Sequence, residues 1–85
     1  HLSLPGCASL KEKRSVVRSL KDRLRSRFQL SVSETGFQDV HAQAELSVAL
    51  VATDRRFAEA VLDKADRLVQ TNGRALIVRV HRDFY

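Results

Sequence analysis

The chain has 85 residues, 44% of them hydrophobic, and a formal net charge of +5 at pH 7. This length fits one small domain over residues 1–85, and the apolar fraction argues against a disordered chain. No apolar run approaches the ~20 residues of a membrane span, and the single cysteine, Cys7, allows neither an internal disulfide nor a cysteine-based zinc site. We therefore expect a cytoplasmic protein without membrane contact, whose basic charge favours acidic partners such as nucleic acid.

The first residues alternate in the manner of a strand. Leu2 and Leu4 share one face, and Pro5-Gly6 ends the run because proline lacks an N–H donor and glycine takes turn conformations readily. Since the alternation is already under way at His1, we expect a first strand that is truncated at its N-terminus.

Residues 9–28 are predicted to form a helix. Ser9 followed by Glu12 has the spacing of a capping box. At 100° per residue, an apolar stripe runs along one side and consists of Leu10, Val17, Leu20, Leu24 and Phe28. Lys13 falls near the middle of this apolar arc, so we expect the helix start to extend beyond the core.

This helix carries nearly all of the charge asymmetry. Between residues 11 and 27, eight basic residues stand against two acidic ones, a local net of +6, so the rest of the chain sums to −1. Five of the cations fall on one line of the helix, ~20 Å long; this line, the basic ridge, consists of Lys11, Arg14, Arg18, Lys21 and Arg25. A helix that only faces water normally interleaves both signs, so the ridge favours a polyanion-binding surface. A solvated or protein-facing helix remains open, because lysine and arginine are also good helix formers.

After residue 28 the spacing of the apolar residues changes from a period of 3.6 residues to a period of two. Leu30 and Val32 alternate with polar residues and predict a short strand, whereas residues 34–43 show little pattern. A third strand is expected over residues 44–52, and its bulkier set should face the helices: Leu46, Val48, Leu50 and Ala52.

A second helix is predicted over residues 54–71, capped by Thr53 or Asp54 and stopped by Asn72-Gly73. Its apolar stripe includes Val61, Leu62, Ala65, Leu68 and Val69, and its charges are mixed in sign. The final strand, residues 75–82, is expected to point Leu76, Val78 and Val80 inward.

The resulting order is βαββαβ. Short connections and right-handed crossovers predict an α+β sandwich, a four-stranded antiparallel sheet in the order 4-1-3-2 with both helices on one face. The predicted core draws on both helices and on the third and fourth strands.

Several runs resemble the bacterial YlxP-like family, and the similarity covers essentially the whole chain. The runs are Leu4-Pro5-Gly6, Ser9-Leu10-Lys11-Glu12-Lys13-Arg14-Ser15-Val16, Ser31-Val32-Ser33-Glu34, Gln38-Asp39 and Ala44-Glu45. The resemblance implies a ferredoxin-like fold, a few more residues of first strand, and a gene neighbourhood of translation initiation and ribosome-maturation factors. It implies no mechanism, because the family's activity is uncharacterised.

The sequence gives little support for a catalytic site or a metal site. An acylphosphatase-like enzyme needs an arginine in the loop after the first strand, but residues 5–8 contain none, and one glycine there does not make a P-loop. Cys7 before a helix N-terminus has no histidine near it in sequence. Two metal sites can be imagined, one from Glu34, Asp39 and His41 and one from His1 and His81, but neither has a dedicated ligand spacing. We expect no enzyme, no metal and no cofactor.

Two functions remain. RNA-recognition domains of this fold stack bases on aromatics of their central strands, and residues 1–4 and 44–52 contain none. We therefore predict a non-catalytic RNA- or ribosome-binding accessory factor that uses its basic helix, through Lys11, Lys13, Arg14, Arg18, Lys21 and Arg25. The alternative is a homodimeric protein-interaction module that pairs through the open sheet face, aided by Phe37, Phe84 and Tyr85.

Overall fold

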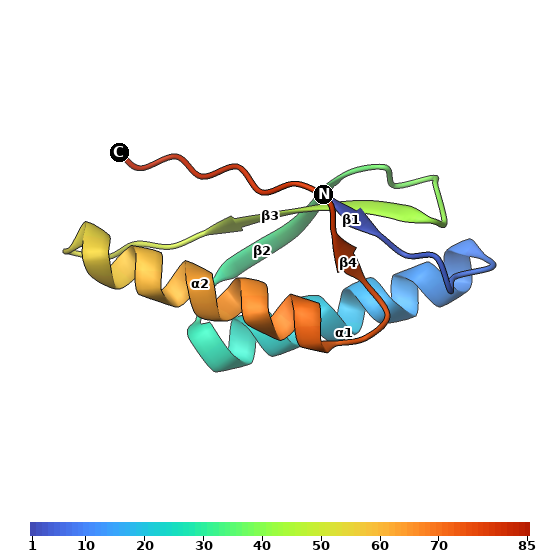
Figure 1. Ribbon diagram of the computed structural model, residues 1–85, viewed down its shortest axis with the longest axis horizontal. Coiled ribbons are helices and arrows are strands. Elements are labelled where there is room, and N and C mark those ends of the chain that lie inside the picture. Colours follow the sequence, from blue (N-terminus) through green and yellow to red (C-terminus); the bar gives the residue numbers. More distant parts are fainter.

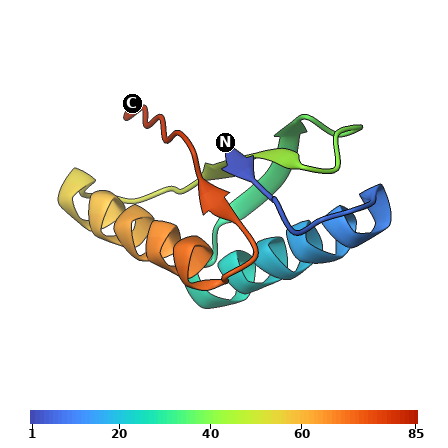
Figure 2. The ribbon, with the colours of Figure 1, turned by 45° about the vertical axis from the view of Figure 1, so that its right-hand side comes forward.

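A computed structural model describes residues 1–85 and confirms the α+β, ferredoxin-like architecture (Figure 1). The elements in chain order are β1 (Leu2–Ser3), α1 (Leu10–Phe28), β2 (Ser31–Gly36), β3 (Gln43–Ala49), α2 (Arg55–Thr71) and β4 (Leu76–Ile77). The antiparallel sheet has the order β2-β3-β1-β4, which is the predicted 4-1-3-2 order counted from the other edge. Both helices lie on one face of the sheet (Figure 2).

The helix boundaries follow from their caps. The Ser9 hydroxyl accepts a hydrogen bond from the Glu12 N–H at 3.2 Å, and the Glu12 carboxylate accepts one from the Ala8 N–H at 3.0 Å. The Asp54 carboxylate accepts from the Arg56 N–H at 2.8 Å and starts α2 in the same manner. Each such cap is worth about 1 kcal/mol. The predicted helix starts are confirmed.

The core lies between α1, α2 and the first part of the sheet. Its innermost residues are Leu4, Leu20 and Ala44, each with no exposed surface. The other buried apolar side chains are Leu2, Cys7, Val16, Val17, Leu24, Leu30, Val32, Ala65, Leu68, Val69 and Ala75.

The prediction for the last strand, residues 75–82, is too long, since β4 spans only Leu76–Ile77, and its register is wrong by one residue. Leu76, Val78 and Val80 are 60%, 58% and 51% exposed, whereas Ala75 is buried and Ile77 packs against the core. The reason is the strand register: Ile77 lies directly opposite Leu2, and residues opposite each other in a sheet share a face. Side-chain bulk alone misassigned the faces of β4.

The register predicted for β3 is correct, but its burial is incomplete. Leu46 and Leu50 pack against the core, whereas Val48 is 39% exposed and Ala52, beyond the end of β3, is exposed as well. The cause is that β1 pairs with β3 only at Gln43 and Ala44. Beyond that point a cleft of about 470 Å³ opens between β3 and residues 77–85.

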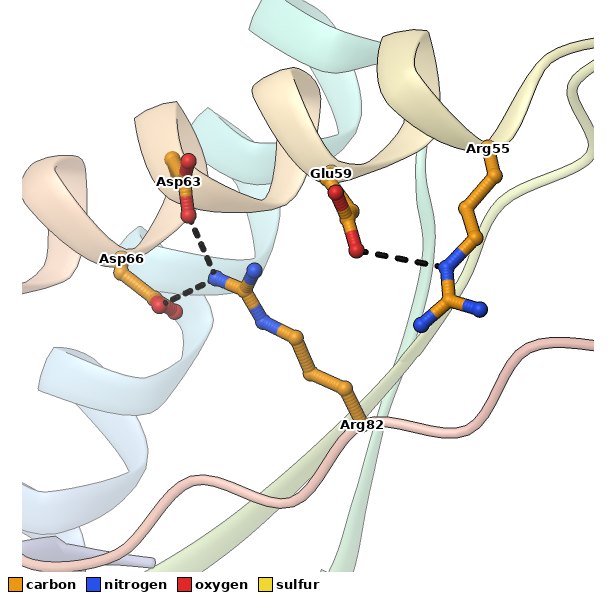
Figure 3. Close-up of polar contacts among 5 residues, drawn as sticks. All are labelled: Arg55, Glu59, Asp63, Asp66 and Arg82. Carbon is orange, nitrogen blue, oxygen red and sulfur yellow. Dashed lines mark hydrogen bonds and ion pairs between the residues drawn. The ribbon is translucent and has the colours of Figure 1, made fainter.

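Residues 78–85 lie beside α2 and are fastened to it by an arginine (Figure 3). Arg82 Nη2 is 3.0 Å from Asp63 Oδ1 and 2.7 Å from Asp66 Oδ2. Burial by itself lowers the pKa of Arg82, but the two carboxylates outweigh it and the pKa is raised. Farther along, the Arg55 guanidinium lies 4.4 Å from the ring centre of Phe84.

Replacing Arg82 by alanine is expected to detach this segment and lower the free energy of unfolding by about 1 kcal/mol, the upper range for partly exposed ion pairs. Amide hydrogen exchange should accelerate at Val78 and Arg79, whose N–H groups donate to the His1 carbonyl, and change little in α1. Arg79→Ala serves as the control, because Arg79 is exposed and its side chain forms no ion pair. Equal exchange rates in the two variants would contradict the fastening role of Arg82.

Candidate nucleic-acid interface

The orientation of α1 against the core determines which of its cations are exposed to solvent. Its buried residues are Lys13, Val16, Val17, Leu20 and Leu24, whereas Leu10 and Phe28 are only half-buried. The buried arc is therefore rotated from the predicted stripe toward Val16. This rotation turns most of the basic ridge farther toward solvent than the sequence pattern indicated.

The first four positions of the ridge carry free positive charge. Lys11, Arg14 and Arg18 are exposed and Lys21 is half-buried. None of these four forms an ion pair, since the ion pairs of the molecule involve other cations. A rigid line of uncompensated cations thus lies along one flank of α1.

The fifth position, Arg25, has a structural contact as well. Its Nη2 donates a hydrogen bond of 2.6 Å to the carbonyl oxygen of Val32. Val32 belongs to the edge strand β2, so the ridge lies on the flank of α1 that faces this strand. The guanidinium has five N–H donors, and the remaining ones can still meet an anion.

Lys13 does not belong to this surface. It is 1% exposed, so the expectation that the helix start extends beyond the core is wrong, and the side chain is not available to a nucleic acid in this structure. Its Nζ lies 2.9 Å from Glu34 Oε2 and also donates a hydrogen bond to the carbonyl of Phe37. Glu34 Oε2 accepts no hydrogen bond of good geometry, so its contact with Lys13 is an ion pair.

The position of Lys13 in the apolar arc was visible in the sequence, but its partners were not. Glu34 and Phe37 lie in and just after β2, in a stretch with little pattern. There a bulge shifts the register between Glu34 and Gly36, and Phe37 adopts a left-handed φ of 57°. The ion pair between Lys13 and Glu34 attaches the start of α1 to the β2–β3 hairpin.

The second helix offers no comparable surface. Arg55 Nε lies 3.3 Å from Glu59, and the carboxylates of Asp63 and Asp66 contact Arg82. Three exposed cations remain without an ion pair, namely Arg56, Lys64 and Arg67. They share α2 with acidic residues and provide a matched control for the ridge.

The residues of the other candidate sites form structural contacts. His1 Nε2 lies 2.8 Å from Gln43 Oε1, His81 Nε2 lies 3.0 Å from Asp83 Oδ2, and Cys7 is buried. No group of three or more histidine, cysteine, aspartate or glutamate side chains is placed to hold a metal ion. Neither helix is long and apolar enough to cross a membrane.

Comparisons with known proteins agree with the resemblance seen in the motifs. A family model described as "Protein of unknown function (DUF503)" matches residues 1–82. The chain is 36% identical over 56 residues to the "Uncharacterized protein YlxP" of Bacillus subtilis (strain 168), a match that covers 66% of this chain and 61% of that protein. No solved structure matches the chain.

Proposed function

Because the chain belongs to the DUF503 family of proteins of unknown function, we propose a role from its own surface: a non-catalytic RNA-binding accessory protein that contacts the RNA backbone through α1. The observation that carries this proposal is the exposed, unpaired row of Lys11, Arg14 and Arg18, continued by Lys21. The two acidic residues of α1 offset this charge only in part, because Glu12 caps the helix and Asp22 forms no ion pair with the ridge.

A ridge on a helix suits phosphate binding for a physical reason. The α1 backbone is ordered before the ligand arrives, so binding orders side chains but no loop. The two central arginines, Arg14 and Arg18, can each offer a planar fork of N–H donors that matches a phosphate. Ridge positions rise by about 1.5 Å per residue along α1, so several phosphates can be met along one face.

The sheet is poorly equipped to read bases. No aromatic residue lies in β1 or β3, the two central strands. Phe37, just beyond β2, stacks on His1 with ring centres 4.7 Å apart. Binding should therefore depend on charge and RNA shape rather than on base sequence.

On β2 and β3 the open face of the sheet gives the dimer alternative little support. Its polar side chains bond to one another: the Thr35 hydroxyl lies 2.7 Å from the Ser47 hydroxyl and donates a hydrogen bond of 3.1 Å to Glu45. These groups need no partner chain to satisfy them.

Structured ribosomal RNA is the ligand to test first, because the resemblance implies a translation-related gene neighbourhood.

Affinity for a structured ribosomal RNA fragment is expected to fall steeply with salt. Each neutralised phosphate contributes about 0.7 to 0.9 to the slope of log K against log salt, so five ridge contacts give roughly 3.5 to 4.5. Fluorescence anisotropy at several NaCl concentrations measures this slope. Absence of binding at low salt, or a slope close to zero, would contradict the proposal.

A further inference from the structure

A second cationic site lies on the opposite side of α1, where the C-terminal parts of the two helices meet (Figure 2). It is a recess of about 280 Å³ whose only hydrophobic lining residue is Leu68. The other lining residues are Arg23, Ser26, Arg27 and Thr71. None of them belongs to the basic ridge.

The charge of the recess selects an anion. Arg23 and Arg27 stand one helical turn apart, both are exposed, and neither forms an ion pair. The C-terminal ends of α1 and α2 each contribute about −0.5 charge, which leaves an excess of roughly +1 from the two arginines. Stabilising the helix ends therefore accounts for only part of their charge.

The hydrogen-bond donors of the recess come from the same two arginines. The Thr71 hydroxyl already donates to the Leu68 carbonyl at 3.1 Å, and the Ser26 hydroxyl lies 3.5 Å from the Arg23 carbonyl. The two guanidinium groups remain free to donate. Paired guanidinium forks match the oxygens of a phosphate.

The recess and the ridge face different ways. At 100° per residue, Arg23 and Arg27 point about 180° away from the mean direction of the ridge. An α-helix with its side chains is about 10–12 Å across, so the two cationic rows are separated by roughly that width. One phosphate backbone that follows the ridge does not reach the recess without crossing the exposed face of α1.

We infer that the recess of Arg23 and Arg27 binds a phosphate of the second strand of double-stranded RNA while the ridge binds the first. This inference rests on the proposed function and specifies its substrate class. A-form RNA has a wide, shallow minor groove that proteins contact by shape, phosphates and 2′-hydroxyls. The α1 face between the two rows carries the small exposed residues Ser15 and Ser19, which allow close approach, and two carboxylates, Asp22 and the helix-capping Glu12.

The test compares three probes of the same sequence: an RNA duplex of about 16 base pairs, its single RNA strand, and the corresponding DNA duplex. The wild-type chain is expected to prefer the RNA duplex to either of the other probes by about tenfold. Arg23→Ala combined with Arg27→Ala should weaken duplex RNA binding by about tenfold and single-strand binding by less than about threefold. The salt slope on duplex RNA should fall by about 0.9, for the one lost phosphate contact.

The control pair is Arg56→Ala with Arg79→Ala, which removes the same charge from residues outside α1 and the recess. It should leave the ratio of duplex to single-strand affinity unchanged. An unchanged ratio in the Arg23 and Arg27 variant, or equal wild-type binding to RNA and DNA duplexes, would overturn the inference while the ridge function stands. Absence of wild-type binding to every RNA probe would overturn both.

Discussion

Replacing Lys13 by methionine is expected to lower the free energy of unfolding by about 3 kcal/mol. Methionine fills similar space but leaves the Glu34 carboxylate without its cation and the Phe37 carbonyl with only the Val40 N–H as a donor. Breaking one side of a buried ion pair costs about 3–5 kcal/mol, and the lower value applies because Glu34 is 19% exposed. A chain of this size has a total stability of roughly 4–13 kcal/mol, so a large share would be lost.

Urea unfolding measures the effect, with Arg14→Met as the neighbouring control. Arg14 is exposed and unpaired, so its replacement should change the free energy of unfolding by less than about 0.5 kcal/mol. Adding Glu34→Gln to Lys13→Met should restore part of the loss, because the double variant buries no uncompensated charge. Equal unfolding midpoints for Lys13→Met and Arg14→Met would show that the buried pair contributes nothing.

Local rules predicted the helix boundaries well. Ser9 and Asp54 cap the helices through short-range contacts, and Gly73, with φ at 81°, lies at the predicted stop of α2. Such features depend on residues within one turn of each other, so the sequence displays them directly. The ridge also follows from helical spacing alone.

The misassigned positions depend on contacts between distant segments. Lys13 became a buried residue because Glu34 is brought to it by the bulged β2–β3 hairpin. The inward face of β4 depends on the pairing of Ile77 with Leu2, about 75 residues away in the chain. The recess needs Thr71 and Leu68 beside Arg23, and no local pattern in α1 predicts that neighbour.

Reversing the charge of Arg14, Arg18 and Lys21 to glutamate is expected to weaken RNA binding by at least about a hundredfold, because three phosphate contacts become repulsive. The fold should persist, since none of the three forms an ion pair and none belongs to the buried arc. Arg25 is left in place because it is bonded to Val32.

The matched control reverses Arg56, Lys64 and Arg67 on α2. Both triple variants change the net charge from +5 to −1, because three cations each become an anion, so the variants differ only in where the charge is placed. Anisotropy titrations with one structured RNA, at one salt concentration, compare them directly. We expect the α1 variant to lose binding and the α2 variant to stay within about tenfold of wild type. Equal losses in the two variants would show that binding follows net charge alone, and the ridge would then be ordinary solvated surface.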